Sequence, residues 1–278
     1  MPASIAPVIV GTALGLREGE FNPLIFLATL ATAVLLQVGA NYANDVFDYL
    51  KGADRVRHGP LRVTQSGLLT PRQMLAGTAV VFGAAALIGV YLVSIGGWPI
   101  LLIGVLSIIC AVAYTAGPFP LAYRGLGDLF AFIFFGVVAV MGTYFLQAGR
   151  FTLASFVASL PNAMFATATI VVNNLRDMDA DRESGKRTLA VRIGDRATRI
   201  EYTLMLAGAY LIPLILRAVG ALQGWGWLLP WASAPAAFML ARDLWRAQRS
   251  AALNPILART TQLNLIFSLL FAAGWVLR

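Results

Sequence analysis

Apolar runs about as long as a membrane is thick recur along this sequence and limit what it can fold into. The clearest are residues 73–94, 97–113, 128–147 and 203–216. A helix needs about 20 apolar residues to cross the hydrocarbon of a bilayer. Only 12% of the residues are charged, whereas a soluble domain carries roughly 25%. The runs are continuous rather than alternating, which excludes a transmembrane barrel, so the sequence predicts an all-α, polytopic membrane protein.

The same pattern predicts nine transmembrane helices, which are expected at residues 3–16, 22–48, 73–94, 97–115, 128–147, 152–175, 199–217, 226–245 and 259–277. The first range is short for a span of about 20 residues. The amino-terminal segment MPASIAPVIVGTAL has no basic stretch before its apolar residues, which argues against a cleaved signal peptide. The single cysteine, Cys110, excludes an internal disulfide.

The basic residues are distributed unevenly between the two sides of this predicted bundle. Seventeen of the 21 lysines and arginines follow the second, fourth, sixth and eighth helices. Loops rich in lysine and arginine stay in the cytoplasm, which places the amino terminus and these four loops there. Orientation in the membrane therefore explains most of the net charge of +8, and a nucleic-acid partner is not expected.

The acidic residues give a more specific signal. All nine aspartates lie on or beside the predicted cytoplasmic face, and six form two clusters at the ends of the second and sixth helices, about 130 residues apart. Both clusters open with asparagine. This weak repeat predicts a single domain over residues 1–278, built from two four-helix halves (about 1–127 and 128–250) and a ninth helix at 259–277. The polar helix ends are expected to face a central cavity that opens to the cytoplasm.

Spacing within the clusters suggests metal ligands. Asn41 and Asp45, and Asn44 and Asp48, are four residues apart, and Asn173, Asp177 and Asp181 continue that interval over two turns. Residues four apart share a helix face. Carboxylate and amide oxygens without histidine or thiolate suit Mg²⁺, which commonly also binds substrate phosphates.

Basic residues follow each acidic cluster closely. Lys51, Arg55, Arg57 and Arg62 follow the first, and Lys186, Arg187 and Arg192 follow the second. Guanidinium and ammonium groups beside magnesium-binding acids are suited to a diphosphate, here that of a lipid whose tail lies among the apolar helices. The alternative is two solvated loop starts with weak surface ion pairs. Two asparagine-led clusters on one face favour the first interpretation.

The motifs resemble a known family. NDVFDYLKGAD and NNLRDMDADRESGKRTLAVRIG are similar to the two aspartate-rich signatures of the UbiA superfamily of intramembrane prenyltransferases. GPLRVTQSG, AYTAGPFPLAYRGLGD and LARTTQLNLIFSLLFAAG resemble its MenA branch, the 1,4-dihydroxy-2-naphthoate polyprenyltransferases. The resemblance runs almost end to end. One departure is that the chain begins at MPAS, without the Arg-Pro stretch usual before the first helix.

The resemblance implies a role for each matching position. It assigns one Mg²⁺ to Asn44 and Asp48 and a second to Asp177 and Asp181. Asp45 and Asp54 are expected to support these ligands or to accept a proton, and Tyr114 matches a family tyrosine near the diphosphate and the allylic carbon. The diphosphate-binding candidates are Lys51, Arg62, Arg124, Lys186 and Arg187. Asp179 lies on the opposite side of its helix and is expected to be solvated, as is His58 in its loop.

The reaction implied by the resemblance is Mg²⁺-dependent transfer of a polyprenyl group. The substrates would be polyprenyl diphosphate and 1,4-dihydroxy-2-naphthoate, and loss of CO₂ would give demethylmenaquinol at the inner face of a bacterial cytoplasmic membrane. Alternatives are another UbiA-type transferase, acting on homogentisate or 4-hydroxybenzoate or moving a phytyl or geranylgeranyl group, and a secondary transporter. Transporter sites lie near the bilayer midplane, whereas these acids lie at one surface. The sequence does not define an oligomeric state or the length of the prenyl chain.

Overall fold

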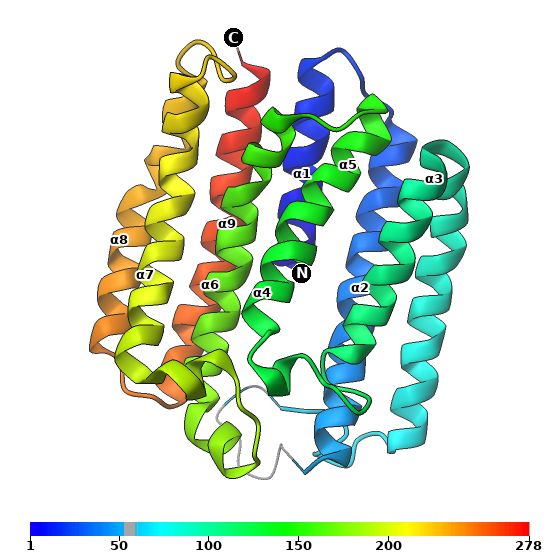
Figure 1. The fold of residues 1–278 in the computed structure, drawn as a ribbon, viewed down its shortest axis with the longest axis vertical. Coiled ribbons are helices and arrows are strands. Elements are labelled where there is room, and N and C mark those ends of the chain that lie inside the picture. The colour runs from blue at the N-terminus through cyan, green and yellow to red at the C-terminus, as the bar shows by residue number, and fades with distance from the viewer. Residues whose placement is uncertain (53–58, 60, 278) are drawn as a thin grey trace.

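The computed structural model describes residues 1–52, 59 and 61–277, and every regular element in this part of the chain is helical. Figure 1 shows the elements running roughly along one direction. In chain order they are α1 (Pro2–Arg17), α2 (Pro23–Leu50), α3 (Pro71–Ala113), η1 (Ala122–Arg124), α4 (Gly127–Ala131), η2 (Phe132–Val138), α5 (Ala139–Ala148), α6 (Leu153–Glu183), α7 (Leu189–Ala218), η3 (Gly226–Ser233), α8 (Ala234–Arg246), η4 (Ala251–Leu253) and α9 (Asn254–Val276).

Six helical stretches of the described chain are long and apolar enough to cross a membrane: α2, α3, Gly127–Ala148, α6, α7 and Ala251–Val276. The all-α membrane fold is therefore confirmed. The expected total of nine spans stays a prediction, because α1 is a shorter apolar helix and α8 is preceded by the 3₁₀ segment η3. Pro230 lies inside η3 and has no backbone N–H to donate.

The element α3 is folded back on itself. Gly97 has φ of +65° and interrupts the helical backbone, and Pro99 follows it. Only glycine adopts such a conformation without steric strain. Figure 1 shows the two limbs of α3 lying side by side, joined at one end. They correspond to the predicted helices 73–94 and 97–115.

Two predicted helices extend further than the apolar pattern indicated. The helix expected at 152–175 continues to Glu183 as α6, and the helix expected at 199–217 begins at Leu189 as α7, with a break at Gly194. The helix ends are set by capping residues and not by the limits of the apolar runs. Ser184 ends α6, and the Thr188 side chain caps the first turn of α7. The connection that carries basic residues is therefore only 184–188.

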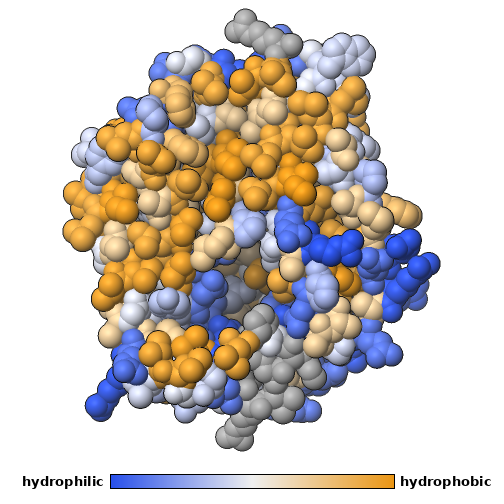
Figure 2. Space-filling view, turned by 180° about the vertical axis from the view of Figure 1, so that it is seen from behind, coloured by the Kyte–Doolittle hydropathy of each residue, from blue (hydrophilic) through white to orange (hydrophobic). Residues whose placement is uncertain are grey.

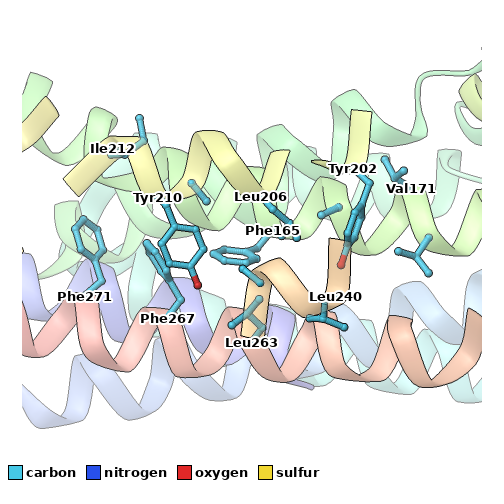
Figure 3. Close-up of a cluster of buried hydrophobic side chains, with 14 of the residues drawn as sticks. Phe165, Val171, Tyr202, Leu206, Tyr210, Ile212, Leu240, Leu263, Phe267 and Phe271 are labelled. Carbon is cyan, nitrogen blue, oxygen red and sulfur yellow. The ribbon is translucent and has the colours of Figure 1, made fainter. Parts of the chain in front are cut away.

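The larger of the two clusters of buried hydrophobic residues in the described chain includes side chains of α6, α7 and α9. Phe165, Tyr210 and Phe267 pack together, with ring centroids 5.1 Å apart for both Phe165–Phe267 and Tyr210–Phe267, and Phe271 extends the group (Figure 3). By contrast, α3 buries little of its apolar surface within the protein. Figure 2 shows apolar side chains over much of one face and hydrophilic ones toward its lower end, where α2 and α6 end in Figure 1.

One helix contact depends on two glycines. A Cβ on Gly226 would lie 2.2 Å from the carbonyl oxygen of Gly274, and a Cβ on Gly274 would lie 2.3 Å from that of Gly226. The backbones of η3 and α9 can therefore approach this closely only because both residues lack a side chain.

Candidate active site

The end of α2 is tied to the segment that follows it. Both carboxylate oxygens of Asp45 accept backbone hydrogen bonds, from Val63 N at 2.9 Å and from Thr64 N at 3.0 Å. Asp45 is thereby occupied in holding residues 61–66 against the helix. This contact brings Arg62, which is the residue before Val63, to 3.5 Å from Asp48.

The ends of α2 and α6 meet through one lysine. Lys186 Nζ lies 4.0 Å from an Asp48 oxygen and 3.6 Å from an Asp181 oxygen. The two aspartates are only 4% and 6% exposed. Tyr123 donates its hydroxyl to the other Asp48 oxygen at 3.0 Å. We call Asp48, Asp181 and Lys186 the outer layer of the site, because they lie nearest the helix ends.

Local backbone geometry places Lys186 between the acids. Its N–H donates to the Asp181 carbonyl at 2.8 Å, and the preceding Gly185 has φ of +77°, which turns the chain back over the end of α6. The Tyr123 ring supports the basic side chains, since Lys51 Nζ lies 4.8 Å and Lys186 Nζ 5.4 Å from its centroid.

The pKa values of Lys186 and Lys51 shift in opposite directions. Burial opposes the charge on Lys186, but the carboxylates of Asp48, Asp181 and Asp177 outweigh it and raise the pKa of the ammonium group. Burial lowers the pKa of Lys51. Lys186 therefore stays positively charged at neutral pH and supplies a fixed cation at the meeting point of the helix ends.

Asp177 has a different partner from Asp181. Arg176, only 3% exposed, binds both Asp177 oxygens, at 2.8 and 2.6 Å, and also reaches Asn173 at 2.8 Å and Asn254 at 2.9 Å. The ligands expected along α6 therefore contact two different basic residues: Asn173 and Asp177 contact Arg176, and Asp181 contacts Lys186. A carboxylate has about four lone-pair sites, so the pairing with Arg176 leaves Asp177 able to accept further contacts.

A second group of polar side chains lies deeper in the bundle. Asn174 donates to both Asp128 oxygens at 3.4 Å. Tyr114 is close by, because a Cβ on Gly127 would lie 2.7 Å from its hydroxyl. Burial, followed by the charges of Asp128, Asp48 and Asp181, raises the pKa of Tyr114. We call Tyr114, Asp128 and Asn174 the inner layer. Beside it, Asn44 accepts a hydrogen bond from Thr115 at 3.1 Å.

The remaining predicted residues lie away from these layers or outside the described chain. Arg124 is exposed and lies 4.4 Å from the Phe119 ring centroid, and the Arg187 side chain is exposed while its N–H bonds Tyr123 O at 3.2 Å. Asp179 is 58% exposed and pairs with Arg249 at 3.0 Å, which confirms its predicted solvation. Asp54 and His58 fall outside the described residues.

The donor set fits a magnesium ion that also binds a substrate. Asn44, Asp48 and Asp181 offer only oxygen donors, and the two carboxylates are buried. Within the described residues, no three acid, histidine or cysteine side chains lie close enough to hold an ion by themselves. Mg²⁺ keeps several waters and typically takes one or two carboxylates together with phosphate oxygens, so a phosphate-bearing ligand would complete this site.

Five residues of the site were not among the predicted ones: Thr115, Tyr123, Asp128, Asn174 and Arg176. All lie within quoted motifs, since AYTAGPFPLAYRGLGD contains the first three and NNLRD contains the other two. These residues could have been found in the sequence as polar residues grouped beside long apolar runs. Arg176 was counted only as a positive charge of the cytoplasmic side.

The fold and site together define an integral membrane bundle with a buried acid–lysine centre at one end. The sequence model of the UbiA prenyltransferase family matches residues 4–276, and the chain belongs to this family. The predicted family membership is therefore confirmed.

Several curated proteins resemble the chain along its length. The 1,4-dihydroxy-2-naphthoate octaprenyltransferase of Escherichia coli is 38% identical over 281 residues, covering 99% of this chain and 91% of that protein. The protein of the same name from Mycobacterium tuberculosis is 34% identical, covering 99% and 92%.

Solved structures share the fold. The apo structure of a UbiA homologue from Aeropyrum pernix matches with a TM-score of 0.72 at 19% identity, covering 98% of this chain and 96% of that one. A UbiA homologue from Archaeoglobus fulgidus, bound to DMAPP and Mg²⁺, matches with a TM-score of 0.69 at 12% identity, covering 100% and 97%.

Proposed function

We propose that the protein transfers a polyprenyl group from polyprenyl diphosphate to 1,4-dihydroxy-2-naphthoate, with loss of CO₂, to give demethylmenaquinol. The observation that carries the proposal is the junction of α2 and α6, where Lys186 lies 4.0 Å from Asp48 and 3.6 Å from Asp181. Buried acids and a fixed cation at one point suit a metal-bound diphosphate. The naphthoate acceptor is inferred from the relatives that carry that name.

The proposed ligands of Mg²⁺ are Asn44 and Asp48 at the end of α2, and Asp177 and Asp181 at the end of α6. Their support is the all-oxygen donor set and the burial of Asp48 and Asp181. The archaeal homologue bound to DMAPP and Mg²⁺ adds support at the level of the fold. Asp45 holds the segment that delivers Arg62, and Asp54 stays a proposal from its motif.

The diphosphate is proposed to lie in the outer layer, against Lys186 and Arg62. Lys51 lies 4.8 Å from the same Tyr123 ring that Lys186 contacts and would reach the outer phosphate. The exposed Arg187 and Arg124 would assist its approach from solvent. Bound Mg²⁺ would supply neutralisation of the charge that develops on the leaving diphosphate.

The chain's own groups perform the remaining tasks. Lys186 and Arg62 hold the leaving diphosphate, and their charges are already in place before the C–O bond breaks. The hydroxyl of Tyr114 stays protonated and faces the allylic carbon. Apolar helix walls exclude water from the reactive carbon, and the prenyl tail lies among them without leaving the bilayer.

The proposed architecture has nine spans in two four-helix halves, with the ninth formed by α9. The site opens toward the cytoplasm at the inner face of a bacterial membrane. This orientation is supported by the bias of lysine and arginine toward the loops at the α2 and α6 ends.

A transfer assay tests the proposal. Purified protein in lipid nanodiscs is given a polyprenyl diphosphate, Mg²⁺ and one of three acceptors: 1,4-dihydroxy-2-naphthoate, 4-hydroxybenzoate or homogentisate. Mass spectrometry should detect decarboxylated prenyl-naphthoquinol only with the naphthoate, and chelation with EDTA should abolish it. Preference for another acceptor would overturn the assigned substrate while keeping the reaction class. Failure with all three, with no prenyl diphosphate bound, would overturn the enzymatic assignment.

A further inference from the structure

Asp128 is a buried carboxylate with no cation assigned to it. It is 5% exposed, and the side-chain contacts that its two oxygens accept are the long 3.4 Å ones from Asn174. No ion pair among the described residues includes it. Burying a negative charge without a cation beside it is unfavourable, so a carboxylate of this kind at a site points to a ligand that completes it.

The position of Asp128 relative to the diphosphate site is defined by α6. Asn174 precedes Asp181 by seven residues on the same helix, which is a separation of about 10 Å along the axis. Asp128, which Asn174 contacts, therefore lies below the outer layer, on the side of the bundle interior. The prenyl tail has to run the same way from its diphosphate, so the allylic carbon passes the inner layer.

We propose that Asp128 binds the ring hydroxyl of the aromatic acceptor and acts as the base that takes its proton. This inference rests on the proposed prenyl transfer and names the acceptor subsite within it. A hydroxyl is the group a bare carboxylate binds, whereas the carboxylate of the acceptor is repelled by Asp128.

The step is balanced in protons and electrons. The O–H bond breaks and its proton passes to an Asp128 oxygen, while the electron pair left on the ring oxygen drives the carboxylate-bearing ring carbon to bond with the allylic carbon. The C–O bond to the diphosphate breaks, and its pair leaves with the diphosphate. As CO₂ departs, the pair of the broken C–C bond restores the aromatic ring and the ring oxygen takes the proton back from Asp128.

The neighbouring groups fit this assignment. Asn174 holds the Asp128 side chain and is a positioning residue. Tyr114 is buried and has a raised pKa, which keeps it a hydrogen-bond donor rather than a competing base.

The test compares Asp128→Asn with the control Glu201→Gln, which removes the charge of another partly buried acid. Asp128→Asn should lower kcat at least 100-fold, leave the Kd for prenyl diphosphate with Mg²⁺ within about threefold, and lose the acidic limb of the kcat/KM pH profile. Asp128→Glu should recover part of the rate. Glu201→Gln should stay near the wild type. An Asp128→Asn enzyme that keeps a third of the wild-type kcat, or a loss that falls on Glu201→Gln instead, would overturn the assignment.

An altered acceptor tests the same point by changing the substrate. Methylating the hydroxyl next to the carboxylate removes the proton that Asp128 is proposed to take. Wild-type enzyme should then fall to the rate of Asp128→Asn, and the variant should lose nothing further. Full wild-type activity on the methylated acceptor refutes the role of Asp128. Absence of prenyl diphosphate binding by the wild type refutes the proposed function itself, so the two failures are distinct.

Discussion

Replacing Lys186 with methionine should weaken the interaction of the site with prenyl diphosphate, because it removes the positive charge and keeps a side chain of similar shape. The ammonium lies 3.6 Å from Asp181 and 4.0 Å from Asp48, and it is proposed to bind the diphosphate as well. A contact to a charged group contributes about 1.5–3 kcal/mol net, and about 1.4 kcal/mol corresponds to tenfold. We therefore expect kcat/KM for prenyl diphosphate to fall about 10- to 150-fold, with little change in the KM for the aromatic acceptor.

The assay is steady-state transfer in nanodiscs at saturating acceptor, with thermal unfolding followed in parallel. Without Lys186 the two buried acids lack their shared cation, so added Mg²⁺ should raise the Tm of the variant more than that of the wild type. Arg182→Met is the matched control, because Arg182 and Asp179 form an exposed pair at 3.8 Å of the kind that contributes little. A Lys186→Met enzyme within threefold of wild type, or an equal loss in Arg182→Met, refutes the reasoning.

Two further variants probe the support of the site and of the fold. Asp45→Asn should release residues 61–66 from α2, because the carboxylate that accepts from Val63 and Thr64 is lost; limited proteolysis should cut this segment faster, whereas Ser66→Ala should leave cleavage unchanged. Gly274→Ala should lower the free energy of unfolding by about 1–3 kcal/mol through overpacking, because its Cβ would meet the Gly226 carbonyl at 2.3 Å. Gly89→Ala, which has open space around it, is the control, and equal Tm values for these two glycine variants would contradict the contact.

Much of the fold could be predicted because membrane thickness sets the length of an apolar helix. The helix expected at 22–48 is Pro23–Leu50, and the one expected at 128–147 is the helical stretch Gly127–Ala148. The polar extensions of α6 and α7 were missed for the same reason: apolarity marks where a helix leaves the hydrocarbon, and capping marks where it ends. Thr188, which caps α7, is one such signal.

The sequence predicted which types of residue form the candidate site, but not which basic residue contacts which acid. Helical spacing brought Asn44 and Asp48 to one face, as the sequence suggested. Which cation meets which acid depends on loop geometry that spacing does not encode: the turn at Gly185 delivers Lys186 to Asp181, while Arg176 turns back onto Asp177. Asp128 was an isolated acid in the sequence, and its importance follows only from its burial against Asn174 from a distant helix.

Binding of a non-reactive prenyl diphosphate analogue, measured by calorimetry with and without Mg²⁺, tests the central claim that the ends of α2 and α6 hold one diphosphate. The account predicts Mg²⁺-dependent binding by the wild type, weakened at least tenfold both by Asp48→Asn on α2 and by Asp181→Asn on α6. A Kd for the analogue that is the same with and without Mg²⁺, or that changes in only one of the two variants, would contradict it.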